Sequence, residues 1–317
     1  NNMLAVLFMA PVILHIARQL QVSPFPYLLA QAAASGAGGT ATLIGSAPNI
    51  MIGSAVKDLK FGTFIFHLAP ISAVVLMANL AMIILLFRKR LQTTLELKNR
   101  LMGLDLSALL SDRKLLLKCL LAICLTMLGF FLQDVLNLEP AVIALAGAFL
   151  LLLLAGERAP SYALSRVEWT AIFFIAGMIT IGSALAETGV MARMAGTVMN
   201  WTGGHTAAAA MLILWISAMV SAFADHIPLV AAMIPLIQEM GELGAANLQP
   251  LWWSLALGTG LGSFGTLAGA GSVLVMAKLA AQEGYVIKFA SYMKTAFPLM
   301  LLSVALSSMY IFLRYLL

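Results

Sequence analysis

Two glycine-rich stretches carry most of the polar residues that could bind an ion. Residues 35–49 read SGAGGTATLIGSAPN and residues 259–272 read TGLGSFGTLAGAGS. Each glycine destabilises a helix by about 1 kcal/mol relative to alanine, so both stretches predict broken helices. A break leaves free N–H groups that suit an anion and free carbonyls that suit a cation. The alternative interpretation is close helix packing through small residues.

A third candidate lies in the stretch SAFADHIP, residues 221–228. Two apolar segments, each too short to span a membrane comfortably, flank it, which predicts a re-entrant hairpin with Asp225 at its tip. An aspartate at the centre of a bilayer is costly unless it is solvated, paired or protonated, so Asp225 is a functional candidate. A helix cap is the alternative. His226 could titrate near neutral pH or serve as a hydrogen-bonded filler.

These three stretches and the first two residues of the chain supply the candidate substrate- or ion-binding residues. They are Asn1, Asn2, Ser35, Gly39, Thr40, Thr42, Asn49, Ser221, Asp225, His226, Ser263, Thr266 and Ser272. We expect no catalytic residues and no metal site, because the few acidic residues and histidines are scattered and form no His-Glu-x-x-His motif. No cofactor is expected, apart from Na⁺ or H⁺ as a coupling ion.

The composition places these residues in a membrane. Of the 317 residues, 62% are hydrophobic and 10% are charged, whereas soluble domains carry about 25% charged residues. Apolar segments of about 20 residues, the length that crosses a bilayer, recur along the chain. We therefore expect an all-α, multi-pass integral protein of the bacterial inner (cytoplasmic) membrane. No basic stripe with interleaved aromatic residues indicates a nucleic-acid partner.

The sequence matches itself, without a gap, at a shift of 224 residues. The matched pairs include Pro11 with Pro235, Pro26 with Pro250, Gly38 with Gly262, Thr42 with Thr266 and Gly45 with Gly269. Shared apolar composition is the alternative explanation. The lysines and arginines of the connector after residue 87 place it in the cytoplasm, which gives the two copies opposite orientations. Inverted repeats that meet at a midplane binding site are typical of secondary transporters.

The repeat predicts three parts: residues 1–87 as the C-terminal remainder of repeat 1, residues 88–114 as a cytoplasmic connector, and residues 115–317 as a complete repeat 2. In repeat 1 we expect a hairpin arm, a broken helix and a span. The elements expected in repeat 2 are scaffold spans at 115–188, an interfacial helix at 190–202, a hairpin at 206–240, a broken helix at 250–281 and a last span at 295–316. Because Asn1 aligns with Asp225, the sequence is expected to be a fragment cut inside its first hairpin.

The same residues resemble a known family. The stretches GGTATLIGSAPN at 38–49, VEW at 167–169 with Phe173 and Phe174, and SAFADHIP at 221–228 with MIP at 233–235 resemble the ArsB/NhaD branch of the ion-transporter superfamily. That branch includes arsenite permeases, Na⁺/H⁺ antiporters and the melanosomal P protein, with dicarboxylate symporters as distant relatives. The resemblance implies a scaffold domain and a moving domain with two hairpins and two broken helices, working as an elevator in a homodimer.

Several positions depart from that family pattern. The hairpin tips read Asp225-His226 and Asn1-Asn2 where the family shows Asp-Asn, and Gly36 follows Ser35 where an asparagine is usual. In the second break, Phe264 and Val273 take places that asparagine often holds, so this half-site has fewer polar ligands.

We expect a secondary active transporter of small inorganic or organic ions, either an anion permease or a cation/proton antiporter, that works by alternating access. Arsenite, sodium, chloride and carboxylates such as citrate are all open as substrates. The alternatives are a membrane-embedded enzyme, a passive channel and a transport-inactive homologue.

Overall fold

The computed structural model describes residues 2–56, 58–92, 94, 96–97, 99, 113–136, 138–156, 163–165, 167, 169–245 and 247–316. These residues form helices, turns and loops, with no β-strand among them, as the sequence predicts. Five of their helices are long and apolar enough to cross a membrane. The number rises to six if the pair α10 (Trp169–Glu187) and α11 (Val190–Trp201), bent by 73°, counts as one span.

The N-terminal part of the chain consists of α1 (Asn2–Gln19), α2 (Phe25–Ala41), α3 (Ala47–Ala55) and α4 (Phe61–Phe87). The first glycine-rich stretch breaks the helix after α2, as predicted. Pro48 lies in the first turn of α3, where a missing N–H group costs nothing. Pro11 and Pro70 lie inside α1 and α4, because neighbouring helices make such prolines tolerable in membrane segments.

The remaining described helices are α6 (Arg113–Phe131), α7 (Gln133–Leu136), α8 (Pro140–Ala155), α10, α11, α12 (Thr206–Phe223), α13 (His226–Glu242), α14 (Gln249–Gly262), α15 (Gly271–Gln282) and α16 (Phe289–Ile311), which ends in a π-helical turn, η2 (Phe312–Leu316). The hairpin and the second break lie where the sequence predicts them. The last span begins before the predicted residue 295, because α16 extends through polar first turns that contain Ser291 and Lys294.

The helix boundaries themselves repeat along the chain. A shift of 224 residues carries the first residues of α1, α2 and α3 onto those of α13, α14 and α15, and it carries the end of α4 onto the end of α16. Shared apolar composition alone would not align four boundaries in this way. The two copies therefore have the same order of helices and breaks.

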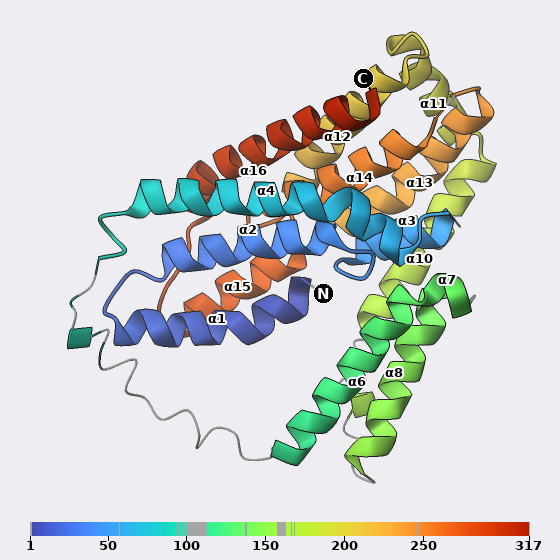
Figure 1. Cartoon of the computed structure of the whole chain (residues 1–317). Helices are drawn as coiled ribbons and strands as arrows, with labels where there is room; N and C mark the ends of the chain where they lie inside the picture. Colours follow the sequence, from blue (N-terminus) through green and yellow to red (C-terminus); the bar gives the residue numbers. More distant parts are fainter. Residues whose placement is uncertain are drawn as a thin grey trace.

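The two copies are packed into each other. In Figure 1, α1, α2, α4, α15 and α16 lie lengthwise beside one another, and α6 and α8 form a separate pair set at an angle to them. The hairpin arm α1 packs against α15, and its equivalent α13 packs against α3. Each hairpin arm thus contacts the second half of the other copy's broken helix, as a two-fold relationship requires.

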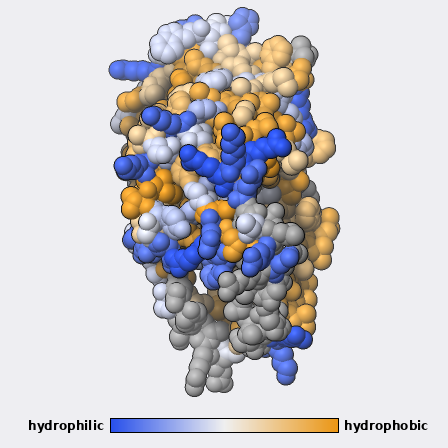
Figure 2. Space-filling model, turned by 90° about the vertical axis from the view of Figure 1, so that its left-hand side faces the viewer, coloured by the Kyte–Doolittle hydropathy of each residue, from blue (hydrophilic) through white to orange (hydrophobic). Residues whose placement is uncertain are grey.

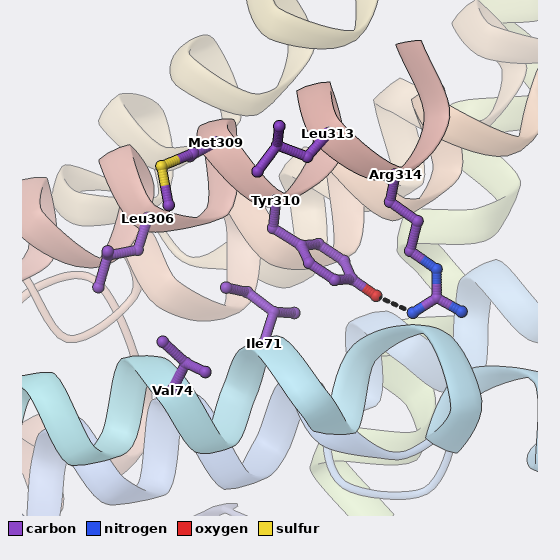
Figure 3. A pocket seen from close by; sticks show the side chains of 7 residues that line it. All are labelled: Ile71, Val74, Leu306, Met309, Tyr310, Leu313 and Arg314. Carbon is purple, nitrogen blue, oxygen red and sulfur yellow. Dashed lines mark hydrogen bonds between the residues drawn. The ribbon is translucent and has the colours of Figure 1, made fainter. Parts of the chain in front are cut away.

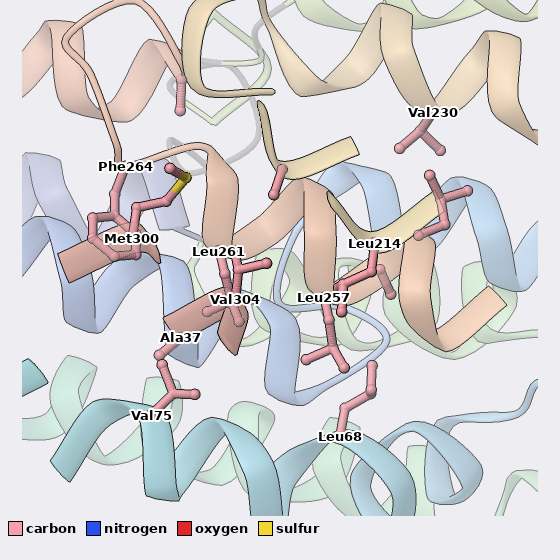
Figure 4. Packing of buried hydrophobic residues seen from close by; sticks show 14 of the residues in the cluster. Ala37, Leu68, Val75, Leu214, Val230, Leu257, Leu261, Phe264, Met300 and Val304 are labelled. Carbon is pink, nitrogen blue, oxygen red and sulfur yellow. The ribbon is translucent and has the colours of Figure 1, made fainter. Parts of the chain in front are cut away.

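Helix α14 lies at the centre of this arrangement. Every residue from Pro250 to Gly262 is buried, because α2, α12, α13 and α16 surround the helix. Figure 4 shows Leu257 and Leu261 of α14 among apolar side chains that come from α2, α4, α12 and α16. The irregular backbone that follows α14 is therefore enclosed by protein, the condition under which such backbone persists at membrane depth.

The outer faces of the helices expose large apolar side chains. Phe66, Met77 and Leu85 of α4 are 68%, 68% and 72% exposed. Hydrophilic side chains gather instead at the end of the molecule that holds the α1–α2 turn, the end of α4 and the α15–α16 loop (Figure 2). Apolar flanks with a polar end fit a protein that has lipid around it and water at its ends.

Candidate functional site

The first break is held by one amide side chain. Asn49, in the first turn of α3, points its Nδ2 at the carbonyl oxygens of Gly39, Thr40 and Thr42, at 3.2, 3.2 and 2.9 Å. These carbonyls lie at the end of α2, where the helix offers no further N–H groups to bond them. The Oδ1 atom of Asn49 and the Oγ atom of Ser46 are buried without a hydrogen-bond partner. Two oxygen acceptors are therefore unused beside the break.

The hairpin arm α1 closes the other side of this break. The backbone N–H of Asn2 donates to the carbonyl of Gly45 (3.2 Å), and the Ser35 hydroxyl donates to the carbonyl of Asn2 (3.1 Å). A Cβ atom on Gly39 would lie 3.6 Å from the Cβ atoms of Asn2 and Ser46. The structure thus gathers Asn2, Ser35, Gly39, Thr42 and Asn49 at one place, whereas Asn1 lies outside the described residues.

At the second break, the start of α13 takes the place of the start of α1. Asp225 is the N-cap of α13, and its Oδ1 accepts a hydrogen bond from the N–H of Ile227 (2.9 Å). The Asp225 side chain is 42% exposed and lies 3.6 Å from Nδ1 of the buried His226. That Nδ1 lies 3.4 Å from the carbonyl oxygen of Gly269. Asn2 and Gly45, the equivalent residues of the first copy, are also joined, but there the backbone N–H of Asn2 is the donor. Asp225 therefore has the role of a helix cap, which was the alternative to an ion-binding role.

Two hydroxyl groups tie the hairpin to the second break. Ser221 donates to the carbonyl of Thr259 (2.7 Å), and Thr266 donates to the carbonyl of Ala222 while accepting from the N–H of Ala268 (3.1 Å). Ser272 is buried in the first turn of α15.

The three hydrogen bonds that Asn49 donates across the first break form a clasp, and the second break has no counterpart of it. Val273 stands at the equivalent position, and a valine side chain cannot hydrogen-bond. The first break therefore has the more polar surroundings of the two.

Two predicted site residues turn their hydroxyl groups towards backbone carbonyls of their own helices rather than into a break. The Thr40 hydroxyl donates to the carbonyl of Ala37 (2.8 Å) and lies 3.2 Å from the Ser72 hydroxyl on α4. The Ser263 hydroxyl donates to the carbonyl of Gly260 (2.7 Å). Both hydroxyls are used to satisfy backbone carbonyls of their own helices, so they contribute to packing in this structure.

The two half-sites meet where α2 crosses α14. A Cβ atom on Gly36 would lie 3.2 Å from the Gly260 oxygen and 3.0 Å from Cδ1 of Phe264, and one on Gly260 would lie 1.9 Å from Cγ2 of Thr40. Gly36 and Gly260 are equivalent under the 224-residue shift, so this crossing lies on the pseudo-twofold axis. Each break begins within about two turns of it.

Sequence analysis missed a second contact on this axis. Asn79 of α4 donates from Nδ2 to the hydroxyl of Ser303 of α16 (2.9 Å), and both side chains are buried. The two residues are also equivalent under the 224-residue shift. The sequence did contain a signal for this contact, because polar residues stand at matching positions of two otherwise apolar spans. Ser46 was also missed, although Pro48 and Asn49 follow it closely in the sequence.

The folded chain defines a polytopic membrane protein whose broken helices meet inside the protein. Among the residues that the structure describes, no group of three His, Cys, Asp or Glu side chains could hold a metal ion. The sequence profile of the citrate transporter family matches residues 1–258. The chain belongs to this family, and it is an integral, multi-pass membrane transporter, not an enzyme.

Individual relatives agree with this assignment. An uncharacterized transporter of Mycobacterium tuberculosis is 36% identical over 99% of this chain and 73% of its own length. A 46 kDa membrane protein of Mycobacterium leprae is 34% identical over 100% of this chain and 74% of its own length. The P protein of Mus musculus is 27% identical over 98% of this chain and 47% of its own length. The expected placement in the ArsB/NhaD branch stays a prediction.

Proposed function

We propose that this protein is a secondary active transporter that binds a small ion between its two broken helices and works by alternating access. The observation that carries the proposal is the clasp at Asn49. Its amide nitrogen holds the end of α2, while its Oδ1 and the Ser46 hydroxyl are buried without partners. Buried polar atoms are costly without a partner, so an ion that supplies one would stabilise the break.

The first half-site suits a cation such as Na⁺. The end of α2 directs its carbonyls and the negative end of its dipole at the break, and the unpartnered Asn49 and Ser46 atoms are oxygens. In transporters with broken helices, unwound carbonyls and half-helix C-termini coordinate the coupling ion. The clasp contains no carboxylate, so a singly charged ion fits it better than a divalent one.

The transported substrate is a small anion in this proposal. The start of α3 presents free backbone N–H groups at the same break, and half-helix N-termini favour negative charge. The name of the matched family favours a carboxylate such as citrate over chloride or arsenite. We therefore propose an anion permease driven by a cation rather than a cation/proton antiporter. Asp225 is the proposed carrier if the coupling ion is a proton.

The wider arrangement follows from the same proposal. The hairpins and broken helices would move together against the scaffold spans in an elevator motion, in a homodimer in the bacterial inner membrane. Both copies would contribute to one moving unit, because each hairpin arm packs on the broken helix of the other copy.

Uptake by the complete gene product in proteoliposomes tests this function. Radiolabelled citrate, succinate, arsenite, chloride and sodium would each be offered with and without Na⁺ and pH gradients. We expect saturable citrate or dicarboxylate uptake that an inward Na⁺ gradient accelerates. Flux that does not saturate and follows only its own gradient would indicate a channel. Absence of flux for all five ions, with folded protein in the vesicles, would indicate a transport-inactive homologue.

A further inference from the structure

An apolar groove runs along the outside of the molecule between α4 and the end of α16. Its volume is about 390 Å³. Figure 3 shows the side chains that line it: Ile71, Val74, Leu306, Met309, Tyr310, Leu313 and Arg314. Val74, Met309 and Leu313 are 54%, 59% and 57% exposed. Six of the seven lining residues are apolar or aromatic, and the single charge lies at one end.

That charge, Arg314, is held in place but not neutralised. Its Nη1 donates to the carbonyl of Phe66 (3.2 Å) and to the Tyr310 hydroxyl. Its guanidinium also lies 4.8 Å from the centre of the Phe66 ring. A guanidinium has five N–H donors, so donors remain for a ligand. The ion pairs found between described residues do not involve Arg314.

The position of Arg314 along α16 corresponds to the edge of the hydrocarbon layer. The inverted repeats place their pseudo-twofold axis in the membrane plane, and Ser303 lies on that axis. Arg314 is 11 residues further along, which is about 16 Å at the rise of a helix. Half of the hydrocarbon thickness is about 15 Å. The groove itself lies between these two levels, at the depth of an acyl chain.

We propose that this groove binds an anionic phospholipid, with an acyl chain along Leu306, Met309 and Val74 and the phosphate on the free donors of Arg314. Charge complementarity selects the occupant. A membrane-facing groove with one unneutralised arginine at headgroup depth matches a ligand that has a long apolar part and a negative head. Arginine suits this role because its planar fork binds phosphate oxygens in pairs. The proposal concerns a site separate from the breaks and does not depend on the proposed function.

Native mass spectrometry of the delipidated full chain in a neutral detergent tests the proposal. Dioleoylphosphatidylglycerol and dioleoylphosphatidylcholine would be titrated in separate experiments, so that only the headgroup differs. We expect the wild-type protein to prefer the phosphatidylglycerol, and Arg314→Gln to weaken its binding about fivefold, the contribution of one basic residue near an anionic surface. Lys288→Gln removes the same charge at the other end of α16 and should leave the preference unchanged.

A second variant tests the groove without touching the charge. Val74→Trp fills the groove, so it should weaken the binding of both lipids while Arg314 stays in place. An unchanged preference in Arg314→Gln, or unchanged lipid binding in Val74→Trp, would overturn the proposal. Displacement of the phosphatidylglycerol by millimolar inorganic phosphate would overturn it as well, because the site would then recognise a free anion rather than a lipid.

Discussion

Asn79 and Ser303 occupy equivalent positions in the two copies of the repeat and are hydrogen-bonded to each other at 2.9 Å. Two residues related by a two-fold axis can touch only where the axis passes between them. With Gly36 and Gly260, this pair fixes the pseudo-axis at two points, one in each pair of crossing helices. The two copies therefore differ in residue type at the point where their equivalent positions touch, because an asparagine amide in one copy meets a serine hydroxyl in the other.

The bond on the axis is expected to stabilise the protein modestly. Asn79→Ala and Ser303→Ala should each lower the free energy of unfolding in detergent by about 1 kcal/mol, because each removes the buried hydrogen bond between the two helices. After Asn79→Ala, the Ser303 hydroxyl still donates to the carbonyl of Leu299 (2.8 Å). Their double mutant should reveal a coupling energy of about 0.6 kcal/mol, typical of hydrogen bonds between membrane helices. Ser307→Ala is the matched control: its hydroxyl is buried without a partner, so its loss should not destabilise. Additive effects of the first two changes would contradict the contact.

The glycine crossing should not tolerate a methyl group. Gly260→Ala would place a Cβ atom 1.9 Å from Cγ2 of Thr40, and overpacking of this kind costs about 1–3 kcal/mol. Thr40→Ser removes that methyl group and keeps the hydroxyl, so the double mutant should recover most of the lost thermal stability. Gly38→Ala, which meets nothing within 4 Å, should be neutral or slightly stabilising. A stable Gly260→Ala single mutant would show that the helices do not cross here.

Asn49→Val copies the residue that the second repeat carries at this position. It leaves the carbonyls at the end of α2 without their common donor, and each unsatisfied buried group costs about 1–3 kcal/mol. We expect a lower melting temperature and loss of Na⁺-dependent uptake in proteoliposomes. Asn247→Ala, which removes only an exposed hydrogen bond to the Gln249 N–H, should change neither. Wild-type Na⁺ dependence in Asn49→Val would exclude the first break as the cation site.

Asp225 combines a capping role with a titratable charge, and two substitutions separate them. Asp225→Asn keeps the oxygen that accepts from Ile227, so it should leave folding intact and abolish pH-dependent, gradient-driven flux. Asp225→Ala also removes the cap and should lower stability by about 1 kcal/mol in addition. The measurement is uptake at several pH values together with a melting curve. Unchanged uptake and pH dependence in Asp225→Asn would leave Asp225 only its role as a cap.

The fold was largely predictable because its signals are strong and local. Glycine density located both breaks, and the alignment of prolines and glycines located the repeat. For the candidate site, the sequence indicated which polar residues lie near the breaks, but not the direction in which their side chains point. A threonine or serine in a helix can bond its own preceding carbonyls as readily as a ligand, so nothing in the sequence indicated that Thr40 and Ser263 turn towards their own helices. The contact of Asn79 with Ser303 depends on how two distant spans cross.

The crossing of Gly36 on Gly260 also restricts how the protein can move. Gly36 and Gly260 carry no side chains of their own there, and the side chains of Phe264 and Thr40 pack directly against them, so one helix has little room to slide over the other. The two breaks are therefore expected to travel as one rigid body. We expect the joints that allow such travel to lie away from the crossing, and the bend of 73° between α10 and α11 is one candidate among the described helices.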